Sequence, residues 1–99
     1  MKKGGYVYII TNKNNSTLYT GVTSNLPLRI NQHKNSTYED SFSARYKLFK
    51  LVYYEGFHTI NEAISREKKI KAGSRKKKIE LVVSMNPQWD DLYEIVMNW

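Results

Sequence analysis

The chain has 99 residues, of which 40% are hydrophobic, which suits one small globular domain and is too much apolar content for a disordered segment. It has no cysteine, which excludes disulfides, thiolate zinc sites and thiol nucleophiles, and its two histidines are too few for a histidine metal site. No apolar run approaches the roughly 20 residues that cross a bilayer. We expect a single cytoplasmic domain over residues 1–99, without a membrane partner.

The net charge of +7 is unevenly distributed along the chain. Half of the sixteen basic residues lie between positions 66 and 78, whereas positions 79–99 hold acidic residues and no Lys or Arg. A local basic patch favours a polyanionic partner, and we expect DNA, with RNA as the alternative. A solvated helix face that keeps the protein soluble would give the same pattern.

Two segments near the N-terminus predict a β-hairpin. Residues 6–11 and 17–23 are rich in aromatic and β-branched side chains, and the Asn-rich stretch 12–15 separates them. A four-residue loop would place Tyr8 opposite Tyr19 in the hairpin. Because side chains alternate along a strand, both tyrosines would then lie on one face of the sheet.

A helix is predicted from Asn25 to about His33. Asn25 is a suitable N-cap, and Pro27 is tolerated in a first turn because its missing N–H would be unpaired there. Arg29 lies four residues before His33, so the two side chains share one helix face. The polar residues 34–44 indicate a loop.

Residues 48–54 are apolar at successive positions, as in a strand that is covered on both faces. Thr59 and Glu62 fit a capping box, which predicts that a helix begins there, and Gly73 would end it. The apolar stripe of this helix also contains Glu67. A carboxylate on the inward face of a helix is unfavourable without a partner, so Glu67 is a candidate metal ligand. The alternative is that the apolar stripe is placed one residue off and that Glu67 does not face inward.

The last segments predict two more helices. Ser74 would cap a helix through about Ser84, the pair at 86–87 (Asn-Pro) would break it, and residues 90–99 would form a short terminal helix. The order of strands and helices indicates an α+β fold, in which helices flank a small three-stranded antiparallel sheet in β-β-α-β-α-α order.

Five polar side chains lie where these elements could bring them together, and each has a task in phosphodiester cleavage. A carboxylate can bind a divalent ion that polarises the phosphate, and without thiolate ligands a hard ion such as Mg²⁺ or Mn²⁺ is expected. An arginine can hold the phosphate, and a tyrosine can act as nucleophile or base once positive charge or metal-bound water activates it. Each residue also has an ordinary structural interpretation, and periodicity alone does not bring these faces together. The candidates are Tyr8, Tyr19, Arg29, His33 and Glu67.

The same residues resemble the signature of the GIY-YIG nuclease superfamily. Residues 7–8 (Val-Tyr) and 19–21 (Tyr-Thr-Gly) are similar to its two signature pieces, and Arg29 and His33 follow at the family's spacing. Residues 63–71 resemble the family's helix with its single metal-binding glutamate. The resemblance covers nearly the whole chain, and it is closer to the small stand-alone members, which are bare domains similar to the N-terminal nuclease domain of an excinuclease.

The resemblance implies that Tyr8 is the general base that activates water, with Tyr19 beside it. It further implies that Arg29 holds the phosphate, that His33 assists proton transfer and that Glu67 holds one Mg²⁺ or Mn²⁺ ion. Which tyrosine is the base stays open at this point.

The sequence departs from the family's pattern at three positions. Tyr6 stands where the first signature glycine would be and Thr20 where an isoleucine would be, and both look like tolerated packing changes. Val22 replaces a lysine that some members carry. The loss of that cation bears on the turnover rate more than on the fold.

The expected function is that of a divalent-metal-dependent endonuclease that hydrolyses phosphodiester bonds in DNA. Structure or damage would direct it, because the chain has no second module to read bases and phosphate contacts carry no sequence information. Two alternatives stay open: a non-catalytic nucleic-acid-binding module, and an interaction domain whose protein partner supplies the substrate. The backbone would be held by the basic residues Lys68, Lys69, Lys71, Arg75, Lys76, Lys77 and Lys78.

Overall fold

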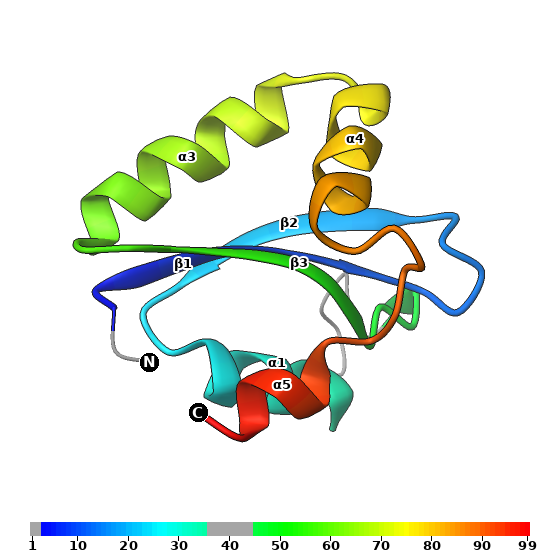
Figure 1. Cartoon of the computed structure of the whole chain (residues 1–99), viewed down its shortest axis with the longest axis horizontal. Coiled ribbons are helices and arrows are strands. Elements are labelled where there is room, and N and C mark those ends of the chain that lie inside the picture. The colour runs from blue at the N-terminus through cyan, green and yellow to red at the C-terminus, as the bar shows by residue number, and fades with distance from the viewer. Residues whose placement is uncertain (1–2, 36–44) are drawn as a thin grey trace.

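The structure is a computed structural model, and it describes residues 3–35 and 45–99. Its centre is a three-stranded antiparallel sheet with the strand order β2-β1-β3 (Figure 1). Strand β1 (Gly5–Thr11) lies between β2 (Leu18–Thr23) and β3 (Lys50–Phe57). The α+β fold with a small antiparallel sheet is therefore confirmed.

Helices cover both faces of the sheet and give three layers (Figure 1). Helices α1 (Leu26–Lys34) and α5 (Tyr93–Met97) lie on one face, and α3 (Ile60–Ala72) and α4 (Arg75–Met85) lie on the other. No helix among the described residues is long and apolar enough to cross a membrane.

The predicted helix starts are confirmed by the caps. The side chain of Asn25 accepts a hydrogen bond from the backbone at the start of α1, and Ser74 does the same for α4. Thr59 and Glu62 form the complete capping box of α3. Most of the loop predicted at 34–44 lies outside the described residues, and α1 continues through Lys34.

The register of the β1–β2 hairpin differs from the prediction by two residues. Tyr8 pairs with Gly21, and Tyr19 pairs with Ile10, so the prediction that the two tyrosines lie opposite each other is wrong. The loop is longer than predicted because Asn12 organises it, accepting a hydrogen bond from the backbone N of Ser16 at 2.8 Å. A shift of two residues preserves the alternation, so Tyr8 and Tyr19 still lie on the same face.

Alternation along β1 divides the core into two clusters. The side chains of Tyr6, Tyr8 and Ile10 pack in the cluster that contains residues of α1 and α5. Val7 and Ile9 pack in the cluster that contains residues of α3 and α4. The central strand is buried on both faces, and Tyr8 brings a hydroxyl into the first cluster.

Asp91 fastens the C-terminal segment to the sheet and to α1. Its Oδ1 accepts hydrogen bonds from the backbone N of Leu51 and of Tyr93, each at 3.1 Å. Its Oδ2 forms an ion pair with the Lys34 ammonium at the end of α1. The segment after α4 therefore helps to hold α1 against the sheet.

Candidate active site

Tyr8 lies in the middle of the central strand, and its side chain is only 1% exposed. A buried hydroxyl needs a hydrogen-bond partner, and Tyr8 Oη lies 3.0 Å from Nε2 of His33 on α1. The space for the Tyr8 ring exists because Gly21 lies opposite: a Cβ at Gly21 would lie 2.4 Å from the Cζ and Oη atoms of Tyr8. The glycine of the Tyr-Thr-Gly tripeptide is therefore required by the position of the Tyr8 ring.

The pKa values of this pair are moved in opposite directions. Burial raises the pKa of Tyr8 to about 12, although the Arg29 guanidinium acts to lower it. Burial and the charge of Arg29 lower the pKa of His33 to about 4. At neutral pH the contact therefore joins a phenol to an uncharged imidazole, which is the form of His33 that can receive a proton.

Arg29 lies on α1, one turn before His33. Its Nε atom is buried and has no hydrogen-bond partner among the described residues. A buried donor of a cationic group that is left unsatisfied is unfavourable, and an anion within reach would satisfy it. The atom thus fits an oxygen of a phosphate group next to Tyr8 and His33.

Tyr19 approaches His33 from the edge strand β2. The ring centroids of Tyr19 and His33 are 6.3 Å apart in an edge-on arrangement, and those of Tyr8 and His33 are 5.7 Å apart. His33 thus contacts both tyrosines, and its Nε2 lies within hydrogen-bond distance of the Tyr8 hydroxyl. Both tyrosine rings therefore pack against the same imidazole.

Glu67 comes to the site from α3, on the opposite face of the sheet. Its side chain is 15% exposed, and its Oε2 lies 3.3 Å from the Lys71 ammonium one turn later. That ammonium lies 6.0 Å from the centroid of the Tyr19 ring on β2. The charge of Glu67 is also felt by Tyr8, where it acts to raise the tyrosine pKa after the larger effects of burial, Arg29 and Tyr19. Because β2 is an edge strand, α3 can bring a carboxylate close to the tyrosines from the other side of the sheet.

The donor set fits one hard divalent ion. Glu67 offers a single carboxylate that could hold such an ion, and no group of three or more His, Cys, Asp or Glu side chains suited to a metal occurs among the described residues. Mg²⁺ keeps several waters and commonly uses one or two carboxylates together with substrate phosphates. A single carboxylate therefore suits an ion that binds together with a phosphate.

The basic residues predicted to bind nucleic acid have different surroundings. Lys71 pairs with Glu67 and belongs to the site around the tyrosines. Arg75 donates hydrogen bonds to the backbone oxygens of Ser16 at 2.9 Å and Asn15 at 3.4 Å, so it ties α4 to the hairpin loop. These two residues therefore have partners within the protein.

The remaining residues of the basic set divide by position. Lys69, Lys77 and Lys78 line a cleft between α3 and α4, whereas Lys68 and Lys76 are exposed and do not line it. Arg66 also lines this cleft and was not among the predicted residues. The sequence could have indicated Arg66 as well, because it lies three residues before Lys69 and residues at this spacing share a helix face.

Comparisons with known proteins identify the family to which the chain belongs. The family model described as the GIY-YIG catalytic domain matches residues 4–80. A UPF0213 protein of Clostridium perfringens is 41% identical over 93 residues, which cover 94% of this chain and 97% of that protein. A UPF0213 protein of Staphylococcus saprophyticus is 40% identical over 77 residues, which cover 78% of this chain and 92% of that protein.

A solved structure of a UPF0213 protein supports the same family assignment. The solution NMR structure of a UPF0213 protein from Bacillus halodurans matches with a TM-score of 0.56 at 28% identity, covering 92% of this chain and 95% of that one. The span matched by the family model includes Tyr8, Arg29 and Glu67. The chain belongs to the GIY-YIG family of nuclease domains and is similar to its small UPF0213 members.

Proposed function

We propose that this chain is an endonuclease that hydrolyses phosphodiester bonds in DNA with the help of one divalent ion, Mg²⁺ or Mn²⁺. The observation that carries the proposal is the 3.0 Å contact between Tyr8 Oη and the uncharged His33, beside the buried, unpartnered Nε of Arg29. A path for a proton and a donor for an anion thus lie side by side. Phosphodiester hydrolysis needs both.

Tyr8 acts as the general base through a proton relay. A water molecule attacks phosphorus while Tyr8 Oη takes one of its protons, and the P–O bond to the leaving oxygen breaks. Because the pKa of Tyr8 is about 12, the tyrosine does not ionise first but passes its own proton to Nε2 of His33 in the same step. His33, in the tautomer with its proton on Nδ1, becomes an imidazolium and returns the proton to solvent, which also protonates the leaving oxygen.

Positive charge holds the phosphate during this step. Arg29 donates to the phosphate oxygens, and Tyr19 packs against His33 and keeps the ring in place. An ion on Glu67 would polarise the phosphate and stabilise the leaving oxygen. Lys71 places a cation 6.0 Å from the centroid of the Tyr19 ring.

The substrate is DNA whose structure or damage marks the site of cleavage. Basic residues on α3 and α4 contact the backbone, and such contacts carry no sequence information. Single-stranded, flap and junction DNA are therefore the first substrates to compare, with RNA beside them. A DNA-processing role agrees with the expected cytoplasmic location.

The test is a cleavage assay on plasmid, single-stranded, flap and four-way-junction DNA with Mg²⁺ or Mn²⁺. We expect metal-dependent cuts that fall by roughly a thousandfold in Glu67→Ala, on the scale of a lost charge-stabilising contact in an active site. Glu94→Ala removes an exposed carboxylate on α5 and serves as the matched control. Equal rates in wild type and Glu67→Ala would contradict the assignment of Glu67.

One observation favours a second candidate, a nucleic-acid-binding module that cuts nothing alone or needs a protein partner. The ion pair between Lys71 and Glu67 neutralises the only carboxylate assigned to the metal. Salt-dependent binding without cleavage under any metal would support this candidate. Recovery of cleavage when a co-purified partner is added would identify the partner-dependent form.

A further inference from the structure

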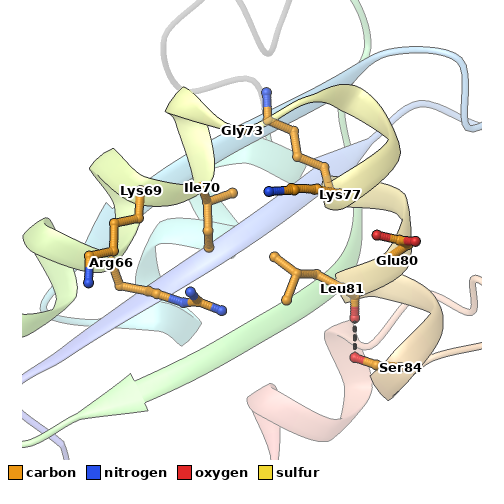
Figure 2. Close-up of a pocket in the computed structure, with 9 residues that line it drawn as sticks. Arg66, Lys69, Ile70, Gly73, Lys77, Glu80, Leu81 and Ser84 are labelled. Atoms are coloured by element: carbon orange, nitrogen blue, oxygen red, sulfur yellow. Dashed lines mark hydrogen bonds between the residues drawn. The ribbon is translucent and has the colours of Figure 1, made fainter.

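A cleft of about 450 Å³ lies between α3 and α4, on the sheet face opposite Tyr8. Figure 2 shows Arg66 and Ile70 reaching into it from α3, and Lys77 and Leu81 from α4. A groove of this size can hold part of a larger ligand against the surface. The cleft lies outside the site around Tyr8 and has no task in the cleavage step.

The charge of the lining selects an anion. Four basic side chains surround the cleft, and the one acidic side chain among the lining residues is Glu80. A concave surface with charge of one sign concentrates its field and attracts ligands of the opposite sign. The basic lining residues are Arg66, Lys69, Lys77 and Lys78.

Arg66 is held in place at the inner side of the cleft. Its Nε donates to Glu55 Oε1 at 3.1 Å, and the Tyr53 hydroxyl donates to the same oxygen at 3.0 Å. This bond uses Nε and leaves the guanidinium directed toward the cleft (Figure 2). An arginine whose orientation is fixed before binding loses little freedom when it meets a phosphate.

Apolar side chains complete the lining. Ile70 is buried and Leu81 is half-buried, and both face the cleft between the charged groups. The lining thus combines basic side chains with a small apolar surface. Such a surface suits a nucleic-acid strand, in which charged phosphates alternate with sugars and bases. A free carboxylate or a simple anion would leave the apolar part without a contact.

We propose that this cleft is a second nucleic-acid site, which binds a backbone phosphate away from the bond that is cut. This inference rests on the proposed function, and it further specifies that the substrate is branched or folded. Lys71, the partner of Glu67, lies over Tyr19 of β2, whereas Arg66 bonds to Glu55 of β3, so the two sites flank α3. A helix with its side chains is about 10–12 Å across. A branched or folded nucleic acid, which offers two backbone segments, can occupy both sites at once.

The test is the salt dependence of binding to a labelled flap DNA. All proteins carry Glu67→Gln and the buffer contains no divalent metal, so that nothing is cut during the measurement. We compare Lys69→Ala/Lys77→Ala, which removes two cations from the cleft, with Lys68→Ala/Lys76→Ala, which removes the same charge from the same helices outside it. Each phosphate contact contributes about 0.7 to 0.9 to the slope of log K against log salt. We expect the slope to fall by about 1.4 to 1.8 in the cleft variant and by clearly less in its control.

Equal changes in the two double variants would overturn the inference, because the helices would then act only as a diffuse basic surface. The absence of a change in both would overturn it as well. Displacement of the flap DNA by excess inorganic phosphate at constant ionic strength would show a site for free phosphate, which also contradicts it. The proposed nuclease activity is tested separately, in the cleavage assay with the protein that retains Glu67. If that protein cuts no DNA with any metal, the nuclease proposal fails, whatever the binding assay shows.

Discussion

On the α1 and α5 side of the sheet, strand β1 buries the hydroxyl of Tyr8 against His33, whereas on the α3 and α4 side it buries Val7 and Ile9, which carry no polar side-chain atom. Both faces exclude water, so both contribute hydrophobic stabilisation. Burial raises the pKa of Tyr8 and lowers that of His33 on the first face, and it also raises the pKa of Tyr53 on the second. Alternation along β1 thus places the tyrosine that we propose as the general base on one face and the apolar side chains of Val7 and Ile9 on the other.

The comparison extends to the polar groups at the borders of each face. Around Tyr8, a donor of Arg29 is left unsatisfied. On the opposite face, Arg66, Glu55 and Tyr53 satisfy one another at the rim of the cleft. Unsatisfied buried groups nevertheless occur on both faces, because Thr20 Oγ1, on the same side of β2 as Leu18 and Val22, also has no partner among the described residues. What distinguishes Arg29 Nε is that the unsatisfied donor belongs to a cation.

The largest expected effect comes from Tyr8→Phe. The ring keeps its packing and loses the hydroxyl that meets His33, so cleavage should fall by roughly 10²- to 10⁴-fold, the usual contribution of a general base. Ile9→Val, the next residue on the opposite face, should lower the free energy of unfolding by about 0.5–1.5 kcal/mol and retain the cleavage rate. Single-turnover cleavage and urea unfolding measure the two effects. Equal loss of activity in both variants would show that the faces are not separate.

Gly21→Ala should damage the Tyr8 face without removing a functional group. The added Cβ would lie 2.4 Å from the Tyr8 ring and hydroxyl, so the ring must move. We expect about 1–3 kcal/mol of destabilisation from overpacking and a loss of roughly a hundredfold in cleavage from the misplaced hydroxyl. Gly56→Ala on β3 is the milder comparison, because its added Cβ would meet Cγ of the flexible Lys3 side chain at 2.9 Å and the Tyr6 ring only at 3.1 Å. An active, stable Gly21→Ala protein would mean that the position of the Tyr8 ring is unimportant.

The pH dependence of stability should report on His33. Its pKa in the folded protein is about 4, below the ordinary value of 6.5, so between these values the unfolded chain binds a proton that the folded protein does not. The free energy of unfolding should therefore fall as the pH drops from 6.5 toward 4, and His33→Gln should remove this part of the decline. Urea unfolding across this range measures it, with the exposed His58→Gln as control for loss of a histidine. Parallel curves for wild type and His33→Gln would contradict the lowered pKa.

The smallest effect concerns the ion pair on α3. In Lys71→Gln the carboxylate of Glu67 loses its cation, so Mn²⁺ should bind the nucleic-acid-free protein more tightly. The Lys71 side chain is 51% exposed, and exposed pairs contribute up to about 1 kcal/mol, so the gain should be roughly two- to fivefold. Calorimetric titration with Mn²⁺ measures it, and Lys68→Gln, on the exposed surface of the same helix, is the control. Unchanged affinity in Lys71→Gln would mean that Glu67 is not the metal ligand of the nucleic-acid-free protein.

The sequence was a good guide where the signals are local. The caps at Asn25, Thr59 and Ser74 lie at the predicted positions because each depends on a side chain that bonds within three residues. The face shared by Tyr8 and Tyr19 was also predictable, because it depends only on alternation. These features depend on neighbouring residues in the sequence and not on contacts between distant segments.

The features that were mispredicted or missed depend on contacts between distant segments. The register of the hairpin was wrong because Asn12 bonds across the loop to Ser16 and lengthens it, which composition does not reveal. The contact between Tyr8 and His33 spans 25 positions of sequence, and the cleft needs α4 to lie beside α3. The proximity of Glu67 to the tyrosines likewise depends on how α3 crosses the edge strand.

The contacts of Asp91 limit where this domain can be truncated or fused to another protein. The span shared with the GIY-YIG family model ends at residue 80, and every residue proposed for catalysis lies within it. Yet Asp91 ties the later segment to β3 and, through Lys34, to the helix that presents Arg29 and His33. Residues after α4 therefore help to hold the helix that carries Arg29 and His33, and a truncated or fused protein without them would keep the signature residues but hold this helix less firmly.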